Sequence, residues 1–299
     1  MQIGIIQNRP GIGDMCLFLP FIQLIAKKYK KKVIIFTKKR SKAKEVLKYD
    51  PHISKVLYID EVKNNHNLEL IKLIKKKKIT KIFIFHFGIR FWLLSILAGV
   101  KNINFYGFFK KKVSISKFIR KKICLWLNIK NLNYSCKIYA PRSKASNNII
   151  IGIGGSGINK KWPIRYYIEL IYELKKRSYK NFIIAGGNNE RKDFYEIFNK
   201  INNVRFKNLC NLSIADSMKI IAGSKYYIGN DTGFMHICAS LNIKSFGLFG
   251  DTPSDYADYN KLIIPVMPKG YSVVSYNHNL MNKISPKDVL KILRKNKVF

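Results

Sequence analysis

The first 36 residues, MQIGIIQNRPGIGDMCLFLPFIQLIAKKYKKKVIIF, contain the pattern that decides the fold. Residues 3–7 form a short apolar run typical of a buried strand, and residues 15–29 carry apolar side chains at helical spacing. A second short apolar run follows at 33–36, and a loop with two glycines separates the first strand from the helix. This order predicts a β-α-β unit whose two strands lie side by side in a parallel sheet.

The same alternation continues along the chain. In the first half we predict further strands at 55–59, 81–85 and 103–106, and helices at 42–48, 68–76, 91–98 and 114–127. The second half repeats the pattern with strands at 149–153, 181–185, 204–206, 226–229 and 245–249, and helices at 163–177, 191–201, 214–222 and 232–241. Strands that alternate with helices predict doubly wound sheets.

The boundary between the halves is predicted where periodicity fades, between 131 and 148, a stretch that includes Pro141. We therefore predict an α/β protein of two facing Rossmann-like domains, residues 1–145 and 146–299, with a cleft between them. The last helix, 286–297, starts with Ser285 as N-cap and Pro286 at the first helical position. We expect this helix to pack back on the N-terminal domain.

Composition limits the class of protein. The chain has 299 residues, of which 47% are hydrophobic, so a disordered or fibrous protein is excluded. It has 56 Lys and Arg against 17 Asp and Glu, a net charge of +39. Residues 1–145 hold 33 of the basic and 6 of the acidic residues, a difference of +27. Such a field attracts nucleic acid, anionic lipid or phosphorylated substrates. Compositional drift in a chain rich in Lys, Ile and Asn is the alternative explanation.

Metal and membrane-spanning classes find no support in the sequence. The five cysteines are scattered without a CxxC pair, which is typical of reduced thiols in a cytoplasmic protein. The five histidines are equally dispersed, so no zinc site is predicted. The most apolar stretch, 82–100, is broken by His86, Gly88 and Arg90 and does not reach the length of a spanning helix. We expect a soluble protein.

The loop after the first strand is the first candidate site. Ligands of doubly wound sheets bind at the carboxyl ends of the strands. Gly11 and Gly13 allow a tight turn and the close approach of a substrate, and Asp14 follows at the start of the helix. An N-cap aspartate is a sufficient explanation for Asp14. A carboxylate in this place can also serve as a general base.

The second candidate is Gly152-Ile153-Gly154-Gly155-Ser156-Gly157, a literal G-x-G-x-x-G. We reject nicotinamide binding, because the helix begins only near Pro163 and the next strand ends without a ribose-binding carboxylate. The loop instead leads to Lys160, which could contact a phosphate, and to Lys161, which we expect to be a solvated lysine of little effect. A surface loop in a lysine-rich protein is the alternative.

The third candidate is Gly229-Asn230-Asp231-Thr232-Gly233-Phe234-Met235-His236, which leaves a strand and enters a helix. The backbone N–H groups and dipole of a helix start form an anion site. Asp231 could simply cap that helix, and His236 could be a buried histidine with satisfied nitrogens.

Together the three segments resemble glycosyltransferase family 9, the lipopolysaccharide heptosyltransferase family. The resemblance rests on GIGDMCLFLP in the first loop and helix, KKWP, GGNNE ending in Glu190, DTGFMH, and the turn Gly250-Asp251-Thr252-Pro253. The chain departs from the family at 86–88, where His-Phe-Gly stands in place of an Asp-x-Gln-Gly segment on the acceptor side.

The resemblance implies a GT-B fold and an inverting mechanism. It implies that Asp14 is the general base in an N-terminal acceptor domain. In the C-terminal domain it implies donor-phosphate contacts for Ser156 and Lys160, a ribose contact for Glu190, and a phosphate-cradling helix start at Thr232 and Gly233. Asp231 and His236 belong to the same motif. No Asp-x-Asp pair occurs, so we expect no metal and no cofactor, and helix N–H groups and a lysine would stabilise the leaving nucleoside diphosphate.

We therefore predict transfer of heptose from ADP-heptose to a lipid A or lipopolysaccharide-core acceptor, and no nucleic-acid partner. The expected location is cytoplasmic, with peripheral contact at the anionic inner face of the inner membrane through the basic runs 75–78, 110–112 and 120–122. The alternatives are another enzyme of the same architecture, such as a nucleotide-sugar epimerase or a transferase that uses a hexose donor, and a nucleotide-sugar-binding protein without transferase activity.

Overall fold

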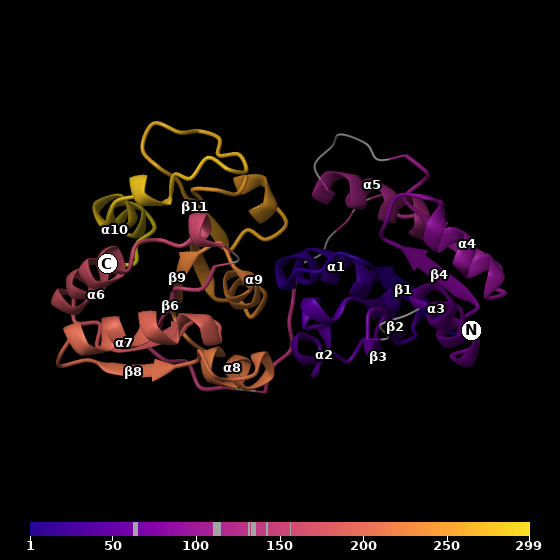
Figure 1. Ribbon diagram of the computed structural model, residues 1–299, viewed down its shortest axis with the longest axis horizontal. Helices are drawn as coiled ribbons and strands as arrows, with labels where there is room; N and C mark the ends of the chain where they lie inside the picture. The colour runs from indigo at the N-terminus through magenta and orange to yellow at the C-terminus, as the bar shows by residue number, and fades with distance from the viewer. Residues whose placement is uncertain (62–64, 110–114, 131, 133–135, 142, 156) are drawn as a thin grey trace. The chain divides into compact units, whose positions relative to one another are not determined.

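The computed structural model describes residues 1–61, 65–109, 115–130, 132, 136–141, 143–155 and 157–299. The chain forms two compact units, Met1–Tyr139 and Ala140–Phe299, each built from one parallel sheet flanked by helices (Figure 1). The first unit ends at Tyr139, whereas the sequence predicts the domain boundary after residue 145. The predicted doubly wound α/β architecture of each half is confirmed.

The sheet of the first unit has the strand order β3-β2-β1-β4-β5, so β1 lies at its centre. Its elements are β1 (Ile3–Gln7), α1 (Ile12–Tyr29), β2 (Val33–Thr37), η1 (Lys39–Ser41), α2 (Ala43–Val46), β3 (Ile53–Tyr58), α3 (His66–Lys76), β4 (Lys81–Ile84), α4 (Ile89–Leu97), β5 (Asn102–Phe105) and α5 (Ile115–Leu127). The predicted helix at 42–48 is reduced to one turn, α2, preceded by the short 3-10 helix η1.

Neighbouring residues of β4 show which helices cover which face of this sheet. Ile82 and Ile84 pack in a cluster with residues of α3 and α4. Phe85, which directly follows β4, stacks on Phe18 of α1 at 5.3 Å and on Trp126 of α5 at 5.8 Å. Because successive strand residues point to opposite faces, α1 and α5 cover one face and α3 and α4 the other.

The sheet of the second unit has the order β11-β10-β9-β6-β7-β8. Its elements are β6 (Ile149–Gly152), η2 (Ile158–Lys160), α6 (Ile164–Lys176), β7 (Asn181–Ala185), η3 (Asn188–Glu190), α7 (Arg191–Lys200), β8 (Arg205–Asn208), α8 (Ile214–Ile221), β9 (Tyr226–Asn230), α9 (Gly233–Ser240), β10 (Lys244–Leu248), η4 (Ser254–Ala257), β11 (Ile263–Val266), η5 (Met281–Lys283) and α10 (Pro286–Lys295). The edge strand β11 is an addition to the strands that the sequence predicts.

The C-terminal helix α10 begins as the sequence predicts. Ser285 Oγ accepts a hydrogen bond from the Asp288 backbone N–H, and Asp288 Oδ2 accepts one from the Ser285 N–H. Inside the second unit α10 packs against α6 and β11, and Val289 and Leu293 are fully buried there. These contacts anchor the end of the chain within the second unit.

No helix in the described part of the chain combines the length and the hydropathy of a membrane-spanning segment. Of the three basic runs in the N-terminal half, 75–78 begins in the last turn of α3 and 120–122 lies within α5. The run 110–112 lies outside the described residues.

Two glycines on adjacent strands hold β6 and β9 close together. Gly152 of β6 pairs with Gly229 of β9, and a Cβ on Gly229 would collide with the backbone of Gly152. A Cβ on Gly152 would instead collide with the side chain of Tyr227, whose hydroxyl donates to Asn230 O at 2.8 Å. The first glycine of the G-x-G-x-x-G segment is thus required for packing of the sheet.

We expect Gly229→Ala to destabilise the second unit by about 1–3 kcal/mol or more, because the clash is with backbone that cannot rotate away. The matched control is Gly154→Ala, where the nearest atom to the new Cβ, Gly186 Cα, is 3.5 Å away, an ordinary van der Waals contact. Urea unfolding followed by tryptophan fluorescence measures both midpoints. Equal midpoints for the two variants would contradict this account of the strand pair.

Candidate functional site

Asp14 lies in the first turn of α1, directly after the central strand β1. Gly11 is the N-cap residue, so Asp14 occupies the third helical position and not the cap predicted as its structural explanation. Its Oδ2 accepts a hydrogen bond from the Gly11 N–H at 3.2 Å, and Oδ1 accepts one from Arg9 Nη1 at 2.8 Å. The side chain keeps 18% of its surface exposed. A carboxylate oxygen accepts more than one hydrogen bond, so both oxygens retain capacity for a proton or a hydroxyl.

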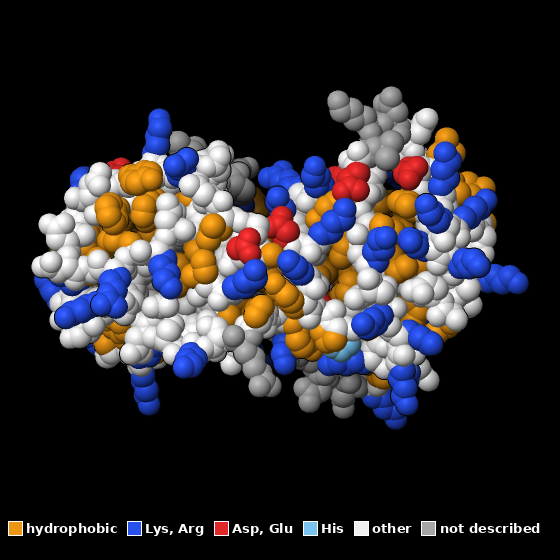
Figure 2. Space-filling model, turned by 90° about the horizontal axis from the view of Figure 1, so that it is seen from below, with side chains coloured by type: hydrophobic (Ala, Val, Ile, Leu, Met, Phe, Trp, Pro, Cys, Tyr) orange, Lys and Arg blue, Asp and Glu red, His pale blue; other side chains and the backbone are white. Residues whose placement is uncertain are grey.

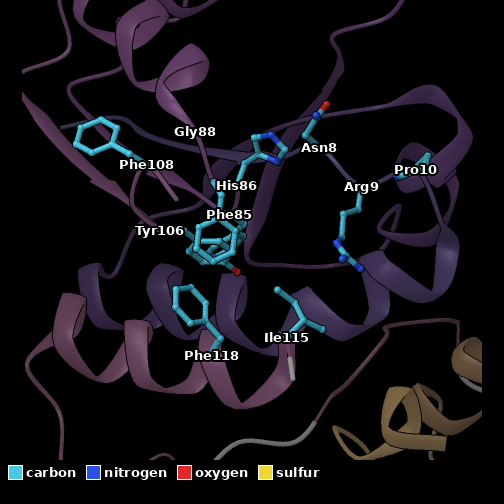
Figure 3. A pocket seen from close by; sticks show the side chains of 11 residues that line it. Asn8, Arg9, Pro10, Phe85, His86, Gly88, Tyr106, Phe108, Ile115 and Phe118 are labelled. Carbon is cyan, nitrogen blue, oxygen red and sulfur yellow. The ribbon is translucent and has the colours of Figure 1, made fainter. Parts of the chain in front are cut away.

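A pocket of about 460 Å³ lies at the carboxyl ends of β1, β4 and β5 (Figure 3). It is lined by Asn8, Arg9, Pro10, Phe85, His86, Phe87, Gly88, Tyr106, Phe108, Ile115 and Phe118. Figure 3 shows the rings of Phe85, Tyr106 and Phe118 gathered together, with Arg9 entering from another side. Arg9 therefore belongs both to the pocket wall and to the ion pair with Asp14.

Burial and nearby positive charges shift the pKa values of two polar side chains in this pocket wall. Burial lowers the pKa of His86, and the charges of Arg90, Lys38 and Arg9 lower it further. Burial raises the pKa of Tyr106 well above its ordinary value, and its hydroxyl is buried without a hydrogen-bond partner among the described residues. An imidazole with a lowered pKa near Arg90, Lys38 and the Asp14-paired Arg9 suits a pocket that receives an anion, because the ligand would add negative charge there.

In the second unit, Asn230 connects three of the candidate segments. Its side chain is fully buried at the end of β9. Asn230 Nδ2 donates to the carbonyls of Ile153 at 3.1 Å and Gly154 at 2.8 Å. Its Oδ1 accepts from the Trp162 N–H at 3.1 Å and lies 2.8 Å from the Tyr167 hydroxyl. The amide thereby fixes the glycine-rich loop and the KKWP segment to the strand that precedes α9.

Lys161, not Lys160, contacts Glu190. Lys161 Nζ lies 2.8 Å from Glu190 Oε1 and 3.6 Å from Asp193 Oδ2. Partial burial lowers the pKa of the Lys161 ammonium, but the hydrogen bonds and charges of Glu190 and Asp193 outweigh burial and raise it overall. A Cβ on Gly155 would lie 2.8 Å from Lys161 Cγ, so the loop packs on the lysine stem. The expectation that Lys161 is a solvated bystander is wrong.

Glu190 is 5% exposed and ends the short helix η3. Its Oε2 accepts a hydrogen bond from the Gly187 N–H at 2.7 Å and would lie 3.8 Å from a Cβ added to Gly154. The glycine-rich loop, Lys161 and Glu190 are thus brought together. Lys160 is half-buried, with Nζ 5.7 Å from the centre of the Tyr276 ring. Ser156 lies outside the described residues.

The start of α9 presents backbone donors at the carboxyl edge of the sheet. Thr232 is the N-cap, but its side chain makes no capping hydrogen bond. Its Oγ1 instead lies 3.4 Å from the Tyr227 hydroxyl. Gly233 is the first helical residue, so no side chain of its own covers the helix start. The first-turn N–H groups of a helix that lacks a side-chain cap are suited to an anionic ligand.

Asp231 and His236 form a buried chain with Tyr259 beside this helix start. His236 is 5% exposed, its Nε2 lies 3.2 Å from Asp231 Oδ1, and its Nδ1 lies 2.8 Å from the Tyr259 hydroxyl. His236 is therefore a buried histidine with both ring nitrogens engaged, one of the two explanations the sequence left open. Asp231 is not the cap of α9, because Thr232 occupies that position. The contacts with His236 orient the Asp231 carboxylate instead.

Sequence reasoning missed four residues of these arrangements: Arg9, Lys161, Asn230 and Tyr259. Asn230 lies inside the third candidate segment. Its amide side chain, placed between a strand and a Thr-Gly helix start, is the sequence signal for its role. Tyr259 lies in the segment after η4, where no pattern marks it. In the described ranges no group of three or more His, Cys, Asp or Glu side chains could hold a metal ion.

Comparisons with known proteins bear on the second unit most directly. The profile of glycosyltransferase family 9 (heptosyltransferase) matches residues 127–287, which include the glycine-rich loop, KKWP, GGNNE and DTGFMH segments. Lipooligosaccharide heptosyltransferase 2 of Campylobacter jejuni is 26% identical over 60% of this chain and 61% of its own length. The match thus spans less than two thirds of that relative.

Two solved structures share the fold over nearly the whole chain. The structure of Escherichia coli ADP-heptose LPS heptosyltransferase II has a TM-score of 0.74 and 17% identity, covering 99% of this chain and 98% of its own. A family 9 glycosyltransferase from Veillonella parvula has a TM-score of 0.79 and 15% identity, covering 98% and 96%. The GT-B-type fold predicted from the resemblance is confirmed. Since the family profile covers 161 of the 299 residues (127 to 287), the chain belongs to glycosyltransferase family 9 (heptosyltransferase).

Proposed function

We propose that the chain is an inverting, metal-independent transferase that moves heptose from ADP-heptose onto a phosphorylated lipid A or lipopolysaccharide-core acceptor. Family membership supports sugar transfer. The Campylobacter jejuni relative is named a lipooligosaccharide heptosyltransferase, and the Escherichia coli structure an ADP-heptose LPS heptosyltransferase. The observation that best supports binding of a nucleotide-sugar donor is the start of α9. This helix start lacks a side-chain cap and follows β9, the strand paired with β6.

In this proposal the second unit binds the nucleotide sugar. The first-turn N–H groups of α9, with Thr232 and Gly233, hold the diphosphate, and Lys160 adds a charge-assisted contact. As the glycosidic bond breaks, negative charge grows on the nucleoside diphosphate, and donors that are already fixed stabilise it without reorganisation. Glu190 accepts a ribose hydroxyl in addition to its contacts with Lys161 and Gly187, because a carboxylate has about four acceptor positions.

The first unit binds the acceptor. A phosphorylated sugar enters the pocket where Arg9 and His86 meet the aromatic wall of Phe85, Tyr106 and Phe118. Asp14 takes the proton from the acceptor hydroxyl as that oxygen attacks the anomeric carbon of the donor. Arg9 and the Gly11 N–H hold the carboxylate in one orientation, and each of its oxygens keeps a lone pair for the hydroxyl.

The donor is tested with a panel of nucleotide sugars. The protein is incubated with a lipid A–core acceptor and ADP-heptose or one of the ADP-, UDP- and GDP-hexoses, and nucleotide release is measured. We expect ADP-heptose to give the highest rate. A higher rate with a hexose donor would assign another sugar to the same fold, and tight binding of a donor with no release in any arm would indicate a binding protein.

Asp14→Asn should lower the rate of transfer by about 10²–10⁴-fold with nearly unchanged donor affinity, because the amide keeps a hydrogen-bond acceptor but cannot take a proton. The matched control is Asp288→Asn, since Asp288 is also the third residue of a helix and accepts the N-cap N–H. Transfer assays and isothermal titration with ADP separate the two effects. If Asp14→Asn transfers sugar at the rate of the control, Asp14 has only a structural role at the start of α1.

Lys160→Ala and Lys161→Ala should change different properties, donor binding in the first and stability in the second. Lys160→Ala should raise the KM for the donor and leave the melting temperature unchanged, because one phosphate contact is lost. Lys161→Ala removes the cation beside buried Glu190 and should destabilise the protein by about 1–3 kcal/mol, while Lys161→Arg restores stability. Thermal melting and donor KM are measured for all three. A stable Lys161→Ala with an increased KM, beside an unaffected Lys160→Ala, would exchange the two roles.

A further inference from the structure

Helix α4 exposes a continuous apolar stripe to solvent. Ile89, Leu93, Ile96 and Leu97 are between 42% and 62% exposed. At about 100° per residue these four positions fall within an arc of roughly 100°. The opposite side of the helix, which includes Phe91, is packed in the core of the first unit. In the core cluster formed by the described residues of this unit, the outer stripe of α4 takes no part.

The apolar surface continues from α4 to the segment after β5. Trp92 of α4 contacts Phe105 at 6.2 Å and Phe108 at 6.0 Å between ring centres. Phe108 is half-exposed, and Phe109 is 85% exposed. We name this the α4–Phe109 surface, made of Ile89, Leu93, Ile96, Leu97, Phe108 and Phe109. Contiguous exposed apolar residues of this kind mark a site of interaction with a protein or a membrane.

The charged residues near this surface are mostly basic, and Glu69 is the acidic residue of the neighbouring helix α3. The sequence has no Asp or Glu between Glu69 and Glu169. Exposed lysines at 72, 75 and 76 lie on α3, which packs beside α4. Arg90, exposed on α4 itself, donates to Asn67 Oδ1 of α3 at 2.6 Å. On the face of the chain that Figure 2 shows, Lys and Arg side chains predominate, and some Asp and Glu groups lie among them.

We propose that the α4–Phe109 surface docks on an anionic lipid bilayer. Its aliphatic and aromatic side chains enter the headgroup–acyl boundary, and the lysines of α3 with Arg90 contact anionic headgroups. Charge complementarity selects the bilayer over a second copy of the chain. Two copies joined through this surface would bring the lysines of α3 and Arg90 of each copy together, with Glu69 as the one carboxylate of α3 to offset them.

This docking places the pocket at the membrane surface, because Phe108 lines the pocket and also belongs to the α4–Phe109 surface. A lipid-anchored acceptor would then reach the pocket by lateral diffusion, without leaving the bilayer. This consequence rests on the proposed function, whereas the docking itself does not.

The test of docking uses the full-length protein and vesicles that contain no acceptor. Co-sedimentation is measured with phosphatidylglycerol–phosphatidylethanolamine vesicles and with neutral phosphatidylcholine vesicles, for the wild type and for the triple variant L93Q/I96Q/L97Q. Gln is a good helix former, so α4 is retained. We expect the triple variant to lower the partition coefficient on anionic vesicles roughly 30- to 100-fold, because three half-exposed aliphatic side chains no longer enter the interface.

The matched control is Y195Q/F198Q, which removes two side chains of similar exposure from α7 in the second unit. We expect it to bind vesicles as the wild type does, and circular dichroism checks that all variants are folded. Wild-type binding that the triple variant retains, or equal losses in both variants, would overturn the proposal. So would a wild-type dimer in sedimentation equilibrium that the triple variant dissociates, since the surface would then join two copies.

A transfer assay separates this proposal from the proposed function. Rates are compared for an acceptor in anionic vesicles and for the same acceptor with its acyl chains removed. We expect the triple variant to lose at least about tenfold in rate on the vesicle-bound acceptor and nothing on the deacylated one. If the wild type transfers to neither acceptor but still binds vesicles, the proposed function fails and the docking stands. Equal rates for wild type and triple variant on both acceptors would overturn the docking as the route of the acceptor.

Discussion

The donor-side architecture depends on one buried amide, the side chain of Asn230. Its two N–H groups and its oxygen are all occupied, by the carbonyls of Ile153 and Gly154, the N–H of Trp162 and the hydroxyl of Tyr167. A buried amide with every position satisfied orders the segments around it, whereas one left partly unsatisfied costs the desolvation of the remaining groups. Through Asn230 the end of β9 determines where the glycine-rich loop and the KKWP segment lie.

The KKWP segment is held at a second point by its tryptophan. Trp162 is 1% exposed, its Nε1 donates to Ile284 O at 2.7 Å, and its ring packs edge-on against Tyr167 at 4.8 Å. The two lysines before it can therefore project from a fixed base, and Lys161 is held against Glu190 while Lys160 is directed elsewhere. A motif that reads as Lys-x-Trp-Pro thus owes its spacing to core packing as much as to ligand contacts.

The sequence predicted the elements of both sheets well, because parallel strands buried on both faces give dense apolar runs such as Ile149–Gly152 that few other structures produce. The start of α10, marked by Ser285 and Pro286, was predicted equally well. Side-chain partners were not. The sequence does not show which of the two adjacent lysines contacts Glu190; in the structure Gly155 packs on the Lys161 stem, and the Lys161 ammonium reaches Glu190. The partners of Asp14 and His236 likewise depend on Arg9 and Tyr259, which carry no pattern of their own.

The charge of the first unit can be separated from compositional drift by looking at where lysine is absent. Drift toward Lys acts on surface positions generally, since these tolerate substitution. Residues 91–100, FWLLSILAGV, contain no charged residue, although α4 exposes Leu93, Ile96 and Leu97 to solvent. In a chain with 56 Lys and Arg, three exposed positions of α4 carry aliphatic side chains while lysines occupy the neighbouring α3. Drift explains the lysines of α3 but not the aliphatic side chains of α4, and a surface that combines both is what an anionic interface with an apolar interior requires.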